Sequence, residues 1–171
     1  MITIVDSGSS VSASNLVQLA EGLRNPTGMD FHPITGDLYL QDNGIDGPTS
    51  IAPLSADEIN IIPADNLGVV LMDFGFAGSY TEYRVDTLVG GAGTKPLVAF
   101  QPLFPDTTVQ LEGPQDVEFA PPGFPDDFNN GLFVGMHGLF SLAGVSNEEN
   151  PLAYVDLRAT TYLAWVDEAE T

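Results

Sequence analysis

A short motif that occurs twice constrains the fold of this chain more than any other feature. Residues 26–33 read PTGMDFHP and residues 114–121 read PQDVEFAP, 88 positions later (114 against 26). In both copies a proline opens the segment, an acidic and an aromatic residue occupy the same places, and a second proline closes it. A glycine-led apolar run follows each copy, at residues 36–40 and 131–135. Two similar units in one chain predict a repeat architecture.

The apolar runs are too short for stable helices and have the length of strands. In the first unit they cover residues 29–32, 38–41, 58–62 and 97–103, and in the second 114–121, 131–135, 152–157 and 161–166. Strand, turn, strand, loop, strand, connection, strand is typical of a propeller blade. The predicted fold is therefore all-β: a β-propeller fragment of about two four-stranded antiparallel blades plus a leading strand at residues 16–20. A plain antiparallel sandwich with two similar hairpins is the alternative.

The predicted organisation follows from these runs. Residues 1–15 are expected to be a linker or frayed N-terminus, residues 16–166 a partial propeller, and residues 167–171 a tail. Blade one covers about residues 26–103 and blade two about residues 114–166. The glycine-rich connection at residues 65–96 shows no clear strands, and such long connections are often functional. Its Tyr80 and Tyr83 either line a sugar site or pack over the blade.

The charge balance limits the partners. The chain has 24 acidic residues against four basic ones, a formal net charge of −20. This composition excludes nucleic acid and anionic membranes as expected partners. It fits calcium binding, a salty habitat or an exported protein kept soluble by charge, so we expect an extracellular or periplasmic location. No stretch approaches the ~20 apolar residues of a membrane span, and the start of the chain lacks the pattern of a signal peptide.

In a four-stranded meander, the entry to the first strand and the loop after the second strand lie at the same end. Arg24, Asn25 and Thr27 should therefore share a rim with residues 41–45, and residues 113–115 should share it with residues 136–138. Ligands of propellers usually lie at that rim, around the central channel. Arg24 is one of only four basic residues. A surface ion pair with Asp42 or Asp46 is an equally good interpretation of it.

Several strings resemble one enzyme family. RNPTG (residues 24–28), DNG (42–44), DEINII (57–62) and the segment GPQDVEFAPPGFPDDFNNGLFVGMHG (113–138) resemble the soluble glucose and sorbosone dehydrogenases that depend on pyrroloquinoline quinone (PQQ). The resemblance covers about residues 16–166 and implies part of a six-bladed β-propeller. The remaining blades, from the same protein or from other copies of the chain, are then expected partners. A small sugar would be the substrate.

The resemblance also implies site residues. Arg24 and Asn25 would contact the carboxylates and carbonyls of PQQ, and guanidinium groups suit carboxylates. Thr27 stands where the family often has glutamine, and its shorter side chain cannot reach as far toward the cofactor. The backbone carbonyls of Gly44 and Ile45 would bind calcium.

The side chains of Asp42 and Asp46 add oxygen donors of the kind that calcium prefers. A solvated acidic turn is the alternative for this loop. Asp57 and Glu58 either support the site or, as we favour, satisfy backbone amides.

The catalytic step limits the functional expectation. Oxidation of a sugar hydroxyl requires a general base, and in the resembled family this base is a histidine from an earlier blade. No confident catalytic residue is present: His137 is a weak candidate, and His32 is expected to be structural. Two hypotheses remain. The chain is part of a quinone-dependent sugar dehydrogenase and is inactive alone, or it is a non-catalytic exported acidic module for binding or scaffolding.

Overall fold

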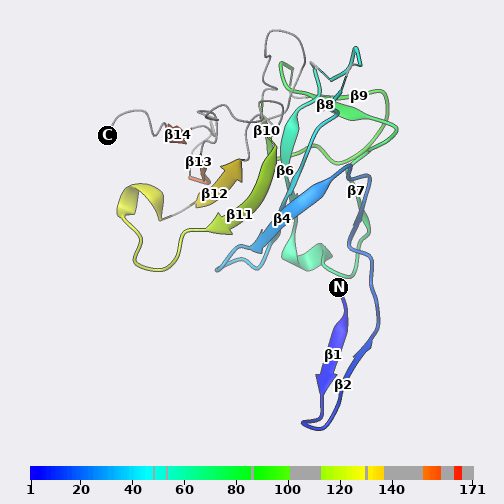
Figure 1. Ribbon diagram of the computed structural model, residues 1–171, viewed down its shortest axis with the longest axis vertical. Coiled ribbons are helices and arrows are strands. Elements are labelled where there is room, and N and C mark those ends of the chain that lie inside the picture. The colour runs from blue at the N-terminus through cyan, green and yellow to red at the C-terminus, as the bar shows by residue number, and fades with distance from the viewer. Residues whose placement is uncertain are drawn as a thin grey trace, which may run out of the picture.

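A computed structural model describes residues 1–47, 49–52, 54–85, 87–100, 113–129, 131–136, 152–158 and 164–166 of the chain. This part of the chain is all-β, with no α-helix, and Figure 1 shows its strands arranged in several small sheets. Two four-stranded antiparallel sheets dominate, as the sequence predicts. The described part contains two short 3₁₀ helices, η1 (Ala64–Asn66) and η2 (Asp126–Phe128), and none of its helices could cross a membrane.

The first sheet is a meander, because its four strands lie side by side in the order in which they occur along the chain. Its strands are β4 (Pro26–Phe31), β5 (Leu38–Asp42), β6 (Asp57–Ile62) and β10 (Val98–Phe100). The reversal between β4 and β5 uses Gly36, which has a φ of 74°, a backbone conformation that glycine adopts without steric cost. The predicted runs at residues 38–41 and 58–62 lie in these strands, and the run at 29–32 extends one residue beyond the end of β4. Residues 101–103 of the predicted fourth run lie outside the described residues.

The second sheet repeats this order. Its strands are β11 (Pro114–Phe119), β12 (Gly131–Met136), β13 (Leu152–Asp156) and β14 (Ala164–Val166), and all neighbours are antiparallel. In both sheets the pairing of the first two strands shifts register near the opening proline, between Pro26 and Met29 and between Pro114 and Asp116. The two copies of the sequence motif therefore share an irregularity as well as a strand order. The predicted tail at residues 167–171 lies outside the described residues.

The two sheets pack face to face along their first strands. The backbone N–H of Phe119 donates to the Asp30 carboxylate at 2.9 Å, and the Thr27 hydroxyl donates to the Gln115 carbonyl at 2.9 Å. A side chain at Gly28 would collide with the backbone of Asp116, so glycine permits this close approach. Figure 1 shows β4 and β11 side by side.

The facing sides of the sheets form the main core. Tyr39 lies edge-on to Phe119, with ring centroids 4.9 Å apart, a preferred geometry for aromatic pairs. Both sheets contribute buried apolar residues to this core: Tyr39, Ile59, Val98, Phe100, Val117, Phe119, Leu132, Val134, Met136, Ala153 and Val155. Side chains alternate between the faces of a strand, so the neighbours of Tyr39 in β5, Leu38 and Leu40, point to the opposite face of the first sheet. There they form a second buried cluster with Ile62 and Phe74.

The connections differ most from the sequence expectations. The leading strand is shorter than residues 16–20: β3 (Ala20–Glu21) pairs in parallel with β7 (Met72–Asp73). The connection at residues 65–96, expected without clear strands, contains β7 and an antiparallel pair, β8 (Tyr80–Glu82) and β9 (Thr87–Val89). This connection covers the second apolar cluster, since Leu67, Met72 and Phe74 pack there. Its pairs are only two or three residues long, too short to give a recognisable period.

Residues 3–14 form a hairpin that the sequence analysis did not predict. Strand β1 (Thr3–Asp6) pairs with β2 (Val11–Ser14), and every residue of both strands is exposed. The turn is closed by local bonds, from the backbone N–H of Ser7 to the Ser10 carbonyl and from that of Gly8 to the Asp6 carboxylate. Figure 1 shows this hairpin projecting away from the two larger sheets.

The shared core predicts which apolar residues determine stability. Ile59 is 0% exposed in the core between the sheets, whereas Ile34 is 89% exposed. Ile59→Ala should lower the free energy of unfolding by about 2–5 kcal/mol, because it removes buried methyl groups and leaves a cavity. The control, Ile34→Ala, should change it by less than about 0.5 kcal/mol. Urea denaturation measures both, and equal losses would contradict the placement of the core.

Candidate functional site

The structure brings the predicted rim residues together at one end of the first sheet. Arg24 and Asn25 precede β4, Asp42 is the last residue of β5, and residues 43–46 follow it. The Arg24 guanidinium donates to the Gly44 carbonyl at 2.6 Å and forms an ion pair with Asp46 at 2.7 Å. The side chain of Arg24 is 24% exposed and that of Asp46 is 61% exposed. The predicted ion pair with Asp46 is therefore present, and Arg24 also fixes the backbone of the loop.

Asp42 connects the two segments of the rim through backbone amides. One carboxylate oxygen accepts the N–H of Arg24 at 2.8 Å and the other accepts the N–H of Asn25 at 2.6 Å. Asp42 is buried, and burial raises the pKa of its carboxyl despite these bonds and the nearby Arg24 charge. Such bonds favour the ionised form, and desolvation opposes it. Asp42 thus orients the RNP segment against the end of β5.

Thr27 lies away from the Arg24 guanidinium, in the contact between the two sheets. Its hydroxyl donates to backbone carbonyls of β11 and accepts a hydrogen bond from the Gln41 amide. This hydroxyl is therefore occupied by the sheet-to-sheet contact. Of the three residues predicted to contact a cofactor, Thr27 is the one whose hydroxyl bonds across the contact between the sheets.

Asp57 bridges the two blades at the rim. Its carboxylate accepts the backbone N–H of Gly44 at 2.8 Å and that of Gly113, at the entry to β11, at 3.2 Å. The interpretation that Asp57 satisfies backbone amides is confirmed. The side chain is 0% exposed, and burial raises the pKa of Asp57 to about 7. The bonds from Gly44 and Gly113 and the Arg24 charge oppose this rise, while the Asp42 charge adds to it.

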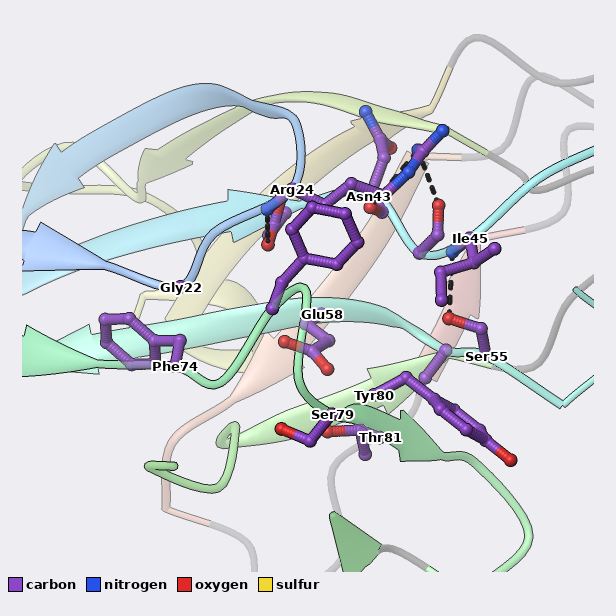
Figure 2. Close-up of a pocket in the computed structure, with 14 residues that line it drawn as sticks. Gly22, Arg24, Asn43, Ile45, Ser55, Glu58, Phe74, Ser79, Tyr80 and Thr81 are labelled. Carbon is purple, nitrogen blue, oxygen red and sulfur yellow. Dashed lines mark hydrogen bonds between the residues drawn. The ribbon is translucent and has the colours of Figure 1, made fainter. Parts of the chain in front are cut away.

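A small open cleft lies beside the rim, between the end of the first sheet and the connection that covers it (Figure 2). Arg24, Asp42 and Asn43 line one side, and Ser79, Tyr80 and Thr81 line the other. Figure 2 shows the Glu58 carboxylate between these two sides. Burial raises the pKa of Glu58, and the nearby Thr81 hydroxyl and the hydrogen bond from Asn60 oppose this rise.

Two polar side-chain atoms of residues that line the cleft, the Asn43 oxygen and the Thr81 hydroxyl, have no hydrogen-bond partner in the part of the chain that the structure describes. Asn43 is 6% exposed, and its side-chain nitrogen donates to the Asn25 carbonyl at 3.3 Å. Its side-chain oxygen is buried and accepts no hydrogen bond there. Buried polar atoms are nearly always satisfied, so these two unpartnered atoms are exceptions in the described part of the chain.

The sequence analysis did not identify Phe74, Phe76, Ser79 and Thr81 as site residues. They belong to the connection at residues 65–96, whose glycine-rich composition indicated only that it could be functional. Tyr80, which was expected either to line a site or to pack, lines the cleft. Tyr83 lies instead under the Arg84 guanidinium, whose carbon is 5.8 Å from the ring centroid.

Most of the predicted calcium ligands have hydrogen-bonding partners within the chain. Both Asp42 oxygens accept backbone N–H groups, the Gly44 carbonyl accepts from Arg24, and Asp46 pairs with Arg24. The N–H of Ile45 donates to the Ser55 hydroxyl at 2.8 Å. The described residues contain no group of three or more His, Cys, Asp or Glu side chains able to hold a metal ion.

Of the two histidines, only His32 lies within the described residues. His32 is structural, as predicted: its ring lies edge-on to Phe119 with centroids 4.8 Å apart, and its Nδ1 accepts the N–H of Thr35 at 3.0 Å. His137, the weak catalytic candidate, lies outside the described residues.

Comparison with known proteins places the fold. No protein-family model matches the sequence. A protein from Borreliella burgdorferi (strain ATCC 35210 / DSM 4680 / CIP 102532 / B31), named as an uncharacterized protein, is 30% identical over 146 residues, which cover 80% of this chain and 32% of that protein. A solved structure of a glucose dehydrogenase matches with a TM-score of 0.53 and 18% identity, over 86% of this chain and 35% of that one. The chain spans about a third of the length of each, and the second likeness confirms the fold alone.

The burial of Asp57 predicts a distinct pH dependence. Its pKa is raised from 3.8 to about 7 on folding, so between these values the folded chain holds a proton that the unfolded chain has lost. Stability from this group is therefore full at low pH and decreases as the pH rises through the window, by up to about 1.4 kcal/mol per pH unit.

Asp57→Asn should remove this contribution. Urea denaturation at about pH 5 and about pH 8 gives the free energy of unfolding of the parent and of the variant. Relative to the variant, the parent should be less stable at the higher pH than at the lower one. Asp65→Asn, which makes the same charge change at an exposed position, is the control and should follow the parent at both pH values. A difference that does not vary with pH for Asp57→Asn would contradict the assignment.

Proposed function

We propose that this chain is a two-blade part of a sugar-dehydrogenase-type propeller and that its rim contributes to a PQQ site, with Arg24 as the main contact. The observation that carries this proposal is the position of Arg24. Its guanidinium is held at the rim by Gly44 and Asp46, lines the cleft and is still 24% exposed. A guanidinium has five N–H donors, more than these contacts use.

The repeat and the fold support the proposal at a coarser level. The two sheets follow the blade order, and the glucose dehydrogenase whose structure matches has the same fold over the matched part. The chain spans about a third of that protein, so sugar oxidation would belong to a whole ring. The general base would come from outside this chain, and within it the rim would bind and orient the cofactor rather than react.

The charges of the cleft limit how tightly PQQ could bind. Asp42 and Glu58 line the cleft together with Arg24, and Asp46 already neutralises Arg24. A cofactor with several carboxylates would meet a negative field unless a cation accompanied it. Calcium at the Gly44 and Ile45 carbonyls is therefore part of the proposal, and it requires Arg24 to release the Gly44 carbonyl.

A non-catalytic exported module is the second candidate. The observation that favours it is that the charged rim residues satisfy one another: Arg24 binds Gly44 and Asp46, Asp42 binds two backbone amides, and Asp57 binds two more. A rim of this kind is stable without a ligand. Its acidity, within a net charge of −20, would then serve solubility or the binding of a partner.

Titration calorimetry with PQQ, with and without calcium, distinguishes the two candidates. The first predicts saturable heat in the presence of calcium and a loss of affinity of at least about tenfold in Arg24→Gln, because a charge-assisted hydrogen bond is lost. Arg84→Gln is the control, since Arg84 lies outside the cleft and pairs with Glu82. No heat for the parent chain at high micromolar PQQ, or equal affinity of both variants, would leave only the second candidate.

A further inference from the structure

The repeat gives two exposed residues of β4 buried counterparts in β11. The motif places Met29 and Phe31 at the positions of Val117 and Phe119, and the pairing of the first two strands agrees with this match. Val117 and Phe119 are 3% and 7% exposed, because they pack in the core between the two sheets. Met29 and Phe31 are 62% and 54% exposed. The first sheet therefore leaves open the side chains that the second sheet uses for packing.

Met29 and Phe31 lie on the face of the first sheet that is turned away from the second. Phe31 is directly opposite Leu38 of β5, and residues opposite each other in a sheet share a face. Leu38 belongs to the second apolar cluster, which the connection at residues 65–96 covers. This cover does not bury Met29 and Phe31, so they form an open apolar strip along β4. Exposed apolar patches on a folded protein mark interaction surfaces.

The outer face of the second sheet has the counterpart of the residue that receives Phe119. Within the chain Phe119 packs edge-on to Tyr39. Tyr39 and Phe133 are equivalent, since each lies opposite the acidic residue of its motif, and Phe133 is only partly buried. Leu152 on the same face is 42% exposed. A side chain at Gly135 would meet no other atom within 4 Å, so there is open space above this part of the sheet.

We propose that the outer face of the second sheet in one copy of this chain packs on the Met29–Phe31 strip of a second copy, in the relation that the two sheets have within the chain. Phe31 of one copy lies against Phe133 of the other, as Phe119 lies against Tyr39. The interface is heterologous, because each copy contributes a different face. Both faces belong to the same chain, so a second copy supplies the missing sheet without any further segment.

The charge of the chain determines how this contact depends on salt. Each copy has a net charge of −20, so two copies repel each other at long range, while the strip itself is apolar. At about 0.15 M salt, charges more than about 8 Å apart are largely screened. Raising the NaCl concentration should therefore strengthen the association. The contact uses no residue of the proposed quinone site, so either proposal can fail while the other holds.

Sedimentation velocity of the whole chain tests the proposal. A contact limited to one strip is weak, so we expect the mean mass to rise with concentration between about 10 and 500 µM. Phe31→Asp on the strip and Gly135→Glu on the outer face of the second sheet should each weaken association by about tenfold or more, because each places a charge in an apolar contact. Val69→Asp, at an 80% exposed position of the connection, adds the same charge elsewhere and should associate like the parent.

Mixing the two variants tests the head-to-tail arrangement itself. Phe31→Asp keeps the outer face of its second sheet, and Gly135→Glu keeps its strip, so an equimolar mixture has one intact pair of faces. The mixture should form dimers at concentrations where each variant alone is monomeric. Leu152→Asp replaces Gly135→Glu on the same face if that variant does not fold, as urea denaturation shows.

Four results would overturn the proposal. The parent could be monomeric at about 500 µM and high salt, which would assign the strip to a different partner. Phe31→Asp could associate like the parent, so that another surface makes the contact. The mixture could associate no better than its components, as expected if one face binds itself. Salt could weaken the association, which would indicate a contact between charges.

Discussion

The contact between β4 and β11, the first strands of the two sheets, is the interaction on which the rest of the structure depends. Neither four-stranded sheet could bury both of its faces alone, and isolated small sheets are marginal in water. Packing them together buries Tyr39 and Ile59 of one against Phe119 and Val134 of the other. The hydrogen bonds across β4 and β11 fix the separation, and Gly28 allows the backbones to approach. This contact also brings the loop after β5 and the entry to β11 close together, where Asp57 binds both Gly44 and Gly113.

The rim is held by carboxylates that bind backbone N–H groups. Asp42 holds Arg24 and Asn25, and Asp57 holds Gly44 and Gly113. In a chain with 24 acidic residues and four basic ones, ion pairs can satisfy only a few carboxylates, so amide donors serve the buried ones. This choice has an electrostatic consequence, since a buried carboxylate without a cation is partly destabilised in its ionised form. The rim therefore combines precise geometry with sensitivity to pH.

The strand order was predictable because the sequence repeats the same pattern of segments in both sheets. The proline-bounded segments that became β4 and β11 and the apolar runs that became β5, β6, β12 and β13 each have enough length to show a pattern. The short pairs were not predictable for the opposite reason: β3 and β7 are two residues each, and β8 and β9 three. The β1–β2 hairpin has a serine-rich sequence that resembles a linker, and its strands are defined only by their pairing with each other.

The candidate site was predictable in position but not in partners. Sequence order placed Arg24 beside residues 42–46, because successive strands of a meander return to the same end. Whether Arg24 points outward or binds its own loop depends on distances that sequence does not contain, and the structure shows it bound to Gly44 and Asp46. The cleft residues Ser79 and Thr81 were unpredictable because they lie in a connection without periodic sequence.

The sign of the charge in the cleft is the property that separates the functional candidates. An anionic cofactor needs Arg24 to dominate, yet Arg24 is the residue whose charge is already met by Asp46 at 2.7 Å. Glu58 has no such partner among the described residues, and Coulomb energies in a partly buried site are several times those in water. An anionic cofactor would therefore meet the carboxylates of Asp42 and Glu58 as well as the Arg24 guanidinium.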